Sequence, residues 1–202
     1  MKIYTIFLLL LFASTFIFSQ NKGTDYWLQL SPEIRLNTSK FEFRYRPYES
    51  FFLTNTDTKK IVTSGRTDLM AGYLYKKFKF FVYAKFDTNK RSFIGPRLDF
   101  NTTALNNRLS IHGQYRYFFG LNRISKDHQY LITILEYETN KFLKPGFFGL
   151  NKHTFKGSRT FFYGPSVSFS IIKNVKLLTS FMKNLNTKSR YFLFVRIGFR
   201  IK

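Results

Sequence analysis

Ser110 and His112 are two residues whose types and spacing fit nucleophilic catalysis. A serine hydroxyl becomes a nucleophile when a histidine within hydrogen-bonding reach takes its proton. The segment SIHG, residues 110–113, places the two residues two positions apart, and residues at this spacing share one face of a β-strand. No third group that would orient the histidine is identifiable. Two interpretations stay open: a nucleophile with its base, and a polar pair that is only hydrogen-bonded.

A second set combines basic and acidic side chains at alternate positions of several segments. Arginine and carboxylate side chains pair through two parallel hydrogen bonds, so the set can form a charge-paired polar interior. The chain has 33 Lys and Arg residues against 11 Asp and Glu, and rings of surplus Arg or Lys attract anions. An anion-attracting pore is therefore the second hypothesis. The predicted cluster consists of Glu33, Arg35, Glu42, Arg44, Arg46, Arg97, Asp99, Arg108, Arg116, Arg196 and Arg200.

Other chemistries lack the residues that they need. The chain has no cysteine, which excludes disulfides, thiol catalysis and cysteine-bound metals. His128 and His153 have no partners at the spacing of a metal site, and no phosphate-binding P-loop is present. We therefore predict no metal and no cofactor, and we expect an enzyme only if Ser110 and His112 act together.

The elements that position these residues are predicted to be β-strands. After residue 20, nearly every segment alternates between apolar and polar residues, the pattern of a strand with two different environments. In KFEFRYR, residues 40–46, aromatic residues at odd positions alternate with charged residues at even positions. HQYLITILEYE, residues 128–138, is more apolar, and its phase is ambiguous. We count about eleven such segments.

The N-terminal residues indicate export. MKIYTIFLLLLFASTFIFSQ begins with Lys2 and an apolar run that ends at Ser19 and Gln20, and this run is shorter than the about 20 residues of a membrane-spanning helix. We predict a signal peptide over residues 1–19 and one domain over residues 20–202, with an uncleaved anchor as the alternative. An exported chain rarely meets nucleic acid, so the net charge of +22 indicates lipid or anionic partners instead.

The apolar faces of the predicted strands favour a membrane. They are continuous and aromatic, in a chain with 27 Phe and 13 Tyr. A sheet can cross hydrocarbon only as a closed barrel with apolar residues outward and polar or small residues inward. We predict an all-β fold, a single antiparallel up-and-down transmembrane β-barrel of about 10–12 strands in the cell outer membrane. Because bacterial barrels of one chain have even strand numbers, we expect ten or twelve.

The last segment illustrates this prediction. In RYFLFVRIGFRIK, residues 190–202, one set of alternate residues is apolar from Tyr191 to Ile201, and the other contains Arg190, Arg196 and Arg200. An arginine is tolerated at such positions when it points into the interior, where carboxylates and water solvate it. A soluble exported β-sandwich or β-barrel, with its apolar faces inward, is the alternative.

Several short segments resemble known outer-membrane proteins. FSQ at 18–20, FEFRYRP at 41–47, HGQYRYF at 112–118 and FVRIGFRIK at 194–202 are similar to small outer-membrane β-barrel proteins of Bacteroidota, and in style to a domain-of-unknown-function family rich in Tyr-Arg pairs. This resemblance implies a barrel in the cell envelope and no activity. Ser110 and His112 also resemble, in reversed order, the His-x-Ser pair of outer-membrane phospholipases. That pair faces lipid, whereas this one has the inward phase.

Together these patterns predict an outer-membrane barrel with a structural or passive transport role that favours anions. A barrel enzyme acting on lipid is one alternative, and a soluble exported barrel that binds anionic ligands is another. The predicted partners are outer-membrane lipid and small anionic solutes.

Overall fold

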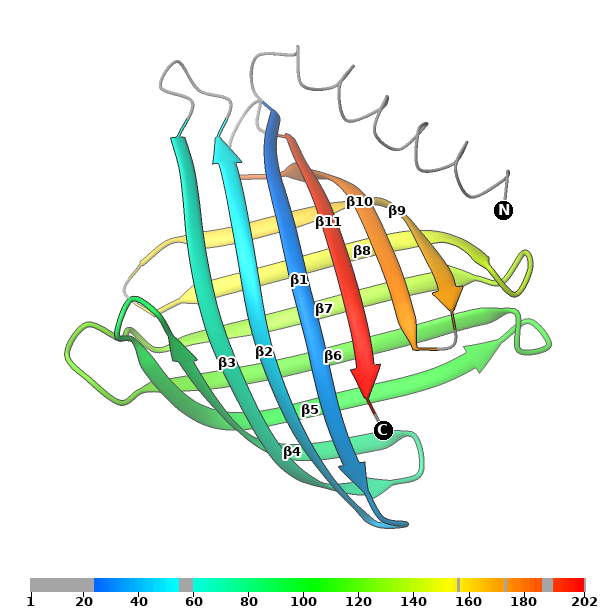
Figure 1. Ribbon diagram of the computed structural model, residues 1–202, viewed down its shortest axis with the longest axis horizontal. Helices are drawn as coiled ribbons and strands as arrows, with labels where there is room; N and C mark the ends of the chain where they lie inside the picture. Colours follow the sequence, from blue (N-terminus) through cyan, green and yellow to red (C-terminus); the bar gives the residue numbers. More distant parts are fainter. Residues whose placement is uncertain (1–23, 55–59, 156, 173, 187–190, 202) are drawn as a thin grey trace.

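The described residues of the computed structural model, 24–54, 60–155, 157–172, 174–186 and 191–201, form a closed β-barrel (Figure 1). The predicted signal peptide, residues 1–19, lies outside them. No helix among the described residues is long and apolar enough to span a membrane. The strands are β1 (Thr24–Asn37), β2 (Phe41–Thr54), β3 (Lys60–Tyr75), β4 (Phe78–Asp87), β5 (Ser92–Ala104), β6 (Leu109–Gly120), β7 (His128–Tyr137), β8 (Leu143–Thr154), β9 (Arg159–Ile172), β10 (Val175–Asn184) and β11 (Tyr191–Ile201).

The barrel closes between its first and last strands, which run in the same direction (Figure 1). Their parallel register sets Leu28 opposite Val195 and Gln29 opposite Arg196. All the other neighbouring strands are antiparallel. Eleven alternating strands leave the first and last pointing the same way, so their pairing has to be parallel. The predicted all-β up-and-down barrel is confirmed, whereas the even strand number and purely antiparallel pairing are wrong.

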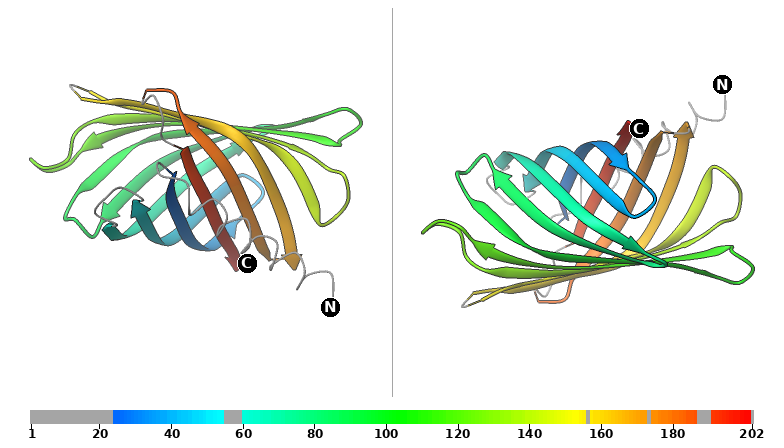
Figure 2. Two further views of the ribbon diagram at one scale, coloured as in Figure 1. Left: turned by 90° about the horizontal axis from the view of Figure 1, so that it is seen from above. Right: turned by 90° about the horizontal axis from the view of Figure 1, so that it is seen from below.

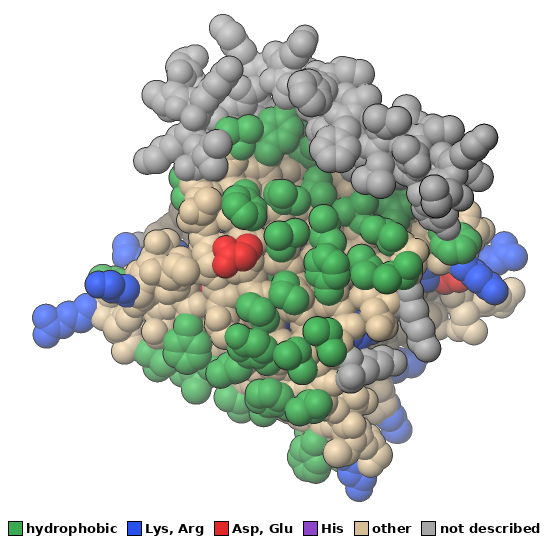
Figure 3. All heavy atoms as spheres, viewed as in Figure 1, with side chains coloured by type: hydrophobic (Ala, Val, Ile, Leu, Met, Phe, Trp, Pro, Cys, Tyr) green, Lys and Arg blue, Asp and Glu red, His purple; other side chains and the backbone are tan. Residues whose placement is uncertain are grey.

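The outer surface of the barrel is apolar. Phe80 and Val82 on β4 are 50% and 62% exposed, and the predicted outward residues Phe41 and Phe43 of β2 are exposed as well. Hydrophobic side chains spread over the outer face of β1, β2, β3 and β11, while Lys and Arg lie mainly at its periphery (Figure 3). Extended exposed apolar surfaces of this kind mark sites of interaction with membranes or with other proteins.

The inner surface is divided into two parts. The inward residues of β1 to β6 are largely charged and buried, and we call them the charged arc: Glu33, Arg35, Glu42, Arg44, Arg46, Arg66, Asp68, Lys79, Lys85, Arg97, Asp99, Gln114 and Arg116. Inward residues of β7, β8, β10 and β11 pack into a hydrophobic cluster, which we call the apolar arc: Ile132, Ile134, Phe148, Leu150, Leu178, Met182 and Phe194. A polar or small inward set was expected throughout, and this expectation is wrong at these seven positions.

The barrel is flattened, with β5 to β8 forming a broad face opposite β1 to β3 and β11 (Figure 2). Its two ends differ in how they are filled. Towards the end where β2 passes to β3, a second cluster joins Met70, Phe81, Tyr83, Phe93 and Phe118. This aromatic packing fills the interior on that side of the charged arc without belonging to it. The opposite end carries the turn between β1 and β2, and we call it the β1–β2 end.

Candidate functional site

A cavity of about 880 Å³ lies inside the barrel and is lined by both arcs. Lys77, Lys176 and Arg200 border it at the β1–β2 end, and Trp27 and Tyr48 border it deeper in the barrel. None of the five residues of the cluster around Phe118 contributes to its wall. Among the described residues, the cavity therefore reaches the β1–β2 end, and aromatic side chains are packed beyond it towards the other end.

Glu33 on β1 is held by cations from three strands. Nη2 of Arg35 lies 2.5 Å from its Oε1, Nη2 of Arg46 contacts its Oε2, and Nε of Arg200 lies 3.7 Å from its Oε1. Arg46 also donates from Nη1 to the hydroxyl of Tyr48 at 2.6 Å. A buried carboxylate requires such partners, and the barrel brings them together from β1, β2 and β11.

Glu42 on β2 has a similar environment. Nε of Arg44 contacts its Oε1, Nε of Arg35 lies 3.5 Å from the same oxygen, and Nζ of Lys79 lies 3.1 Å from Oε2. Arg44 also reaches Asp99 on β5, with Nη1 3.6 Å from Oδ2. The cations outnumber the carboxylates that they share, which leaves the charged arc with a positive surplus.

Arg116 and Arg196 have no carboxylate partner among the described residues. Arg116 donates from Nη2 to Oε1 of Gln114 and from Nη1 to the hydroxyl of Tyr83, the latter at 3.5 Å. Arg196 donates from Nη2 to the hydroxyl of Ser31 at 3.0 Å. Arg116 is 8% exposed, and its buried Nε has no hydrogen-bond partner within the described part of the barrel. Two cavity guanidiniums are thus compensated by neutral groups only.

The structure brings most of the predicted cluster together at this cavity. All members except Glu42 and Arg108 line its wall. Glu42 is buried and contacts Arg44, which is one of the wall residues. Arg108 was expected to point inward, and this is wrong: it is exposed in the turn before β6, where residues 105–107 have positive φ. Arg190 lies outside the described residues.

Ser110 and His112 both line the cavity near its entrance, yet no hydrogen bond joins them in the described part of the chain. The partner of His112 is Asn101 on β5, with Nδ1 and Oδ1 2.5 Å apart. A base has to reach the hydroxyl proton that it removes. The contact with Asn101 orients the imidazole but does not join it to Ser110, so the role of this pair stays a prediction.

Sequence reasoning missed the apolar half of the cavity wall. Ile132 and Ile134 on β7 and Phe148 and Leu150 on β8 line the cavity opposite the charges. The signal was present in β7, whose segment is apolar on both faces and whose phase was therefore ambiguous. Tyr48 was missed as well, since an aromatic residue among alternating charges was not expected to face inward.

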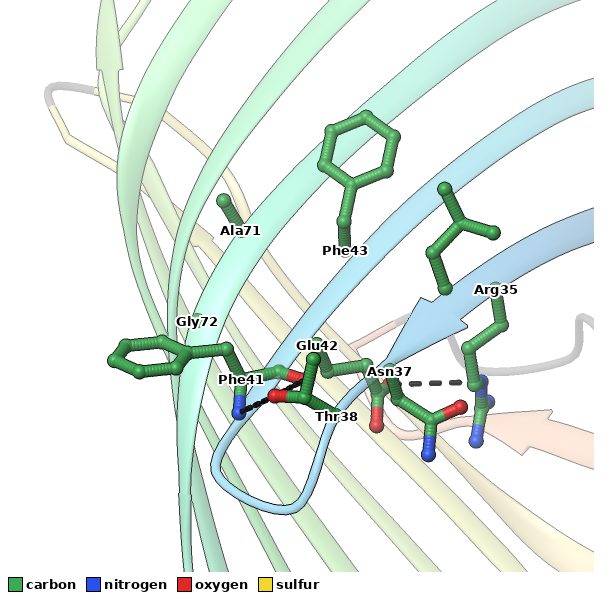
Figure 4. Close-up of a pocket in the computed structure, with 9 residues that line it drawn as sticks. Arg35, Asn37, Thr38, Phe41, Glu42, Phe43, Ala71 and Gly72 are labelled. Carbon is green, nitrogen blue, oxygen red and sulfur yellow. Dashed lines mark hydrogen bonds and ion pairs between the residues drawn. The ribbon is translucent and has the colours of Figure 1, made fainter.

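A second hollow, of about 550 Å³, lies at the β1–β2 hairpin (Figure 4). The turn is closed by Thr38, whose Oγ1 accepts a hydrogen bond from the backbone N of Phe41 at 3.1 Å. Phe43 and Arg35 point to opposite sides of this hairpin, so the hollow borders the outer apolar surface. Its charged residues, Arg35 and Glu42, already belong to the interior cluster.

Comparisons with known proteins add little to this picture. No family model matches the chain, and no curated protein matches it, so the resemblance to a Bacteroidota family stays a prediction. Among solved structures the chain is similar to a KdgM porin, with 14% sequence identity, a TM-score of 0.47, and coverage of 79% of this chain and 89% of that chain.

Proposed function

We propose that this chain is an integral outer-membrane β-barrel with a passive role in the passage of anions. The proposal rests on the distribution of side chains, which is the opposite of that in an ordinary soluble protein: apolar side chains lie outside and charged ones inside. Val82 is 62% exposed on the outside, while Asp99 and Arg97 are 1% and 3% exposed within. A closed sheet with this arrangement suits hydrocarbon, because closure pairs the backbone groups and the outer side chains need no water.

The charge of the cavity wall supports anions over cations. Clefts lined by one sign of charge concentrate ions of the opposite sign. The acidic residues of the wall are Glu33, Asp99 and Glu136. The basic residues are Arg35, Arg44, Arg46, Arg66, Lys77, Lys79, Arg97, Arg116, Lys176, Arg196 and Arg200.

The packing beyond the cavity limits how large a passing solute can be. Tyr83 and Phe118 pack edge to face with ring centroids 4.8 Å apart, and the ring of His128 lies 4.9 Å from that of Phe118. Nζ of Lys85 lies 4.7 Å from the centroid of the Phe93 ring. We therefore expect small unitary conductance instead of the wide aqueous passage of a large porin.

Two measurements test the membrane location. After cell fractionation we expect the mature chain in the outer membrane, released by detergent and not by high salt. The unboiled protein is expected to migrate differently on a denaturing gel from the boiled protein, because a closed barrel resists unfolding by the detergent. A freely dissolved monomer that needs no detergent would contradict this part of the proposal.

Planar-bilayer recordings test the preference for anions. Under a KCl gradient, the reversal potential of the wild-type protein is expected to have the sign of an anion-selective pore. The double variant Arg116→Gln, Arg196→Gln removes two cations that have no carboxylate partner and is expected to move the reversal potential towards zero. Arg108→Gln removes one exposed charge outside the cavity and serves as the control. Cation selectivity, or no conductance at all, would overturn the transport role.

A further inference from the structure

Two arginines of the cavity stand beside apolar residues of a neighbouring strand. Arg116 on β6 lies directly opposite Tyr130 on β7. Arg196 on β11 lies directly opposite Leu178 on β10. Opposed inward side chains of neighbouring strands are in contact range. Each arginine therefore presents a cation beside an apolar wall.

These are the same two arginines that contact no carboxylate in the described part of the barrel. The guanidinium carbon of Arg196 lies 5.8 Å from the centroid of the Tyr48 ring, and that of Arg66 lies 4.1 Å from the same ring. Arg46, Arg66 and Arg196 thus converge on Tyr48, while the guanidinium carbon of Arg116 lies 5.2 Å from the centroid of the Tyr83 ring. A buried guanidinium with only neutral partners is a site that an anion stabilises.

The side chains of the apolar arc offer no hydrogen-bond donor or charge to an ion. Ile134, Phe148, Leu150 and Leu178 all line the cavity and belong to one hydrophobic cluster. An inorganic anion bound at the arginines would leave this wall in contact with water. A hydrocarbon chain attached to the anion would cover it, with a gain of about 0.8 kcal/mol for each buried CH₂ group.

We propose that the cavity binds a single-chain amphiphile, with its anionic head at Arg116 and Arg196 and its hydrocarbon chain along the apolar arc. This inference rests on the proposed function, because it names the class of anion that the interior takes. The cavity volume of about 880 Å³ falls within the roughly 300–1,000 Å³ of small-molecule sites. Entry is from the β1–β2 end, where Lys77, Lys176 and Arg200 border the opening.

Trp27 supplies a probe for this site without any labelling. It is the only tryptophan of the chain, it lines the cavity, and it packs on the apolar arc with its ring 4.7 Å from that of Phe194. Bromine quenches tryptophan fluorescence at short range. Bromododecanoate added to the full-length mature barrel in a non-ionic detergent is therefore expected to quench Trp27 in a saturable way.

Competition and charge variants separate specific binding from partition into the micelle. Unlabelled dodecanoate or dodecyl phosphate is expected to restore the fluorescence, and the stronger competitor identifies the head group as carboxylate or phosphate. The methyl ester of bromododecanoate, which has no charge, is expected to bind at least tenfold more weakly. Arg116→Gln and Arg196→Gln are each expected to weaken bromododecanoate binding about tenfold, whereas Arg108→Gln leaves it unchanged.

A substitution in the apolar arc tests whether this wall binds the hydrocarbon chain. Leu178→Asn keeps every charge and is expected to weaken bromododecanoate binding at least fivefold. Sulfate has no hydrocarbon chain, so its own affinity, measured by its competition with bromododecanoate, is expected to change little. Each variant is checked for heat-modifiable migration, so that a misfolded barrel is not mistaken for an empty one. Quenching that does not saturate, or that is equal in the wild type, the ester and the arginine variants, would overturn the inference.

Failure of this inference and failure of the proposed function give different results. If the chain forms no membrane barrel, heat-modifiable migration and detergent extraction fail first. If it forms an anion-selective barrel that takes only small ions, the bilayer recordings succeed while saturable quenching of Trp27 is absent.

Discussion

On β5, Arg97 donates two hydrogen bonds to Asp99, the residue two positions along the same strand. Nε lies 2.7 Å from Oδ1, and Nη2 lies 2.6 Å from Oδ2. Gln114 on β6 adds a third hydrogen bond, from Nε2 to Oδ1 at 2.8 Å. Side chains two apart share one face of a strand, so a single strand can carry its own ion pair into the interior. Arg44 with Glu42 and Arg35 with Glu33 repeat the arrangement on β2 and β1.

Asp99→Asn is expected to destabilise the barrel by about 3–5 kcal/mol, because it leaves the buried guanidinium of Arg97 without its carboxylate. Denaturant titration of the refolded protein in detergent measures this loss. Glu138→Gln is the control: Glu138, just after β7, pairs with Lys144 near the start of β8 at 2.5 Å, and this contact lowers the pKa of its exposed carboxyl. We expect no measurable change for the control, and equal stability of the two variants would show that the interior pair is as dispensable as a surface one.

Val82→Arg tests the environment of the outer surface. Val82 lies near the middle of β4 with its side chain outward. In a bilayer, an arginine at mid-depth on the lipid face is expected to cost about 2–4 kcal/mol. Folding into lipid vesicles measures the cost, with Ile124→Arg, at an exposed position between β6 and β7, as the control. Unchanged folding of Val82→Arg would favour the soluble alternative, since water solvates the new charge.

Gly95→Ala tests a close approach between β5 and β6. A Cβ at Gly95 would lie 1.8 Å from the backbone oxygen of Tyr117, so the strands have to separate. Overpacking of this kind costs about 1–3 kcal/mol, and the heat-modifiable fraction after refolding is expected to fall. Gly113→Ala is the matched control, because its Cβ would meet nothing closer than 3.9 Å. Equal refolding of the two variants would refute the steric argument.

The described residues show no hydrogen bond between Ser110 and His112, which predicts that this pair does not catalyse acyl transfer. We expect no fatty-acid release from phospholipid vesicles by the purified wild-type barrel, because a base has to reach the hydroxyl proton that it removes. The contact of His112 Nδ1 with Oδ1 of Asn101, at 2.5 Å, orients the imidazole but does not join it to the serine. Acyl release that is lost in both Ser110→Ala and His112→Ala would contradict this expectation and restore the lipid-acting alternative.

Local alternation made the strands and the two faces of β1 to β6 predictable from sequence. The residue types of each strand show which face is outside: in β2, exposed Phe41 and Phe43 alternate with buried Glu42 and Arg44. The intrastrand ion pairs follow from the same spacing. The predicted direction of Arg108 was wrong because this residue has the inward phase but lies in the turn before β6 begins. In a turn, alternation no longer fixes the direction of a side chain.

The sequence by itself determined a two-faced, eleven-segment β-chain with charges set against aromatic residues, because the period of a strand is local. Only the tertiary structure decided the rest. Closure of the first strand on the last made that pairing parallel, and the arrangement of the strands set the contacts of Arg46 and Arg200 with Glu33 and of Arg44 with Asp99. The registers of β6 with β7 and of β10 with β11 placed Arg116 beside Tyr130 and Arg196 beside Leu178. These relations depend on register and on the number of strands in the ring, which no single segment encodes.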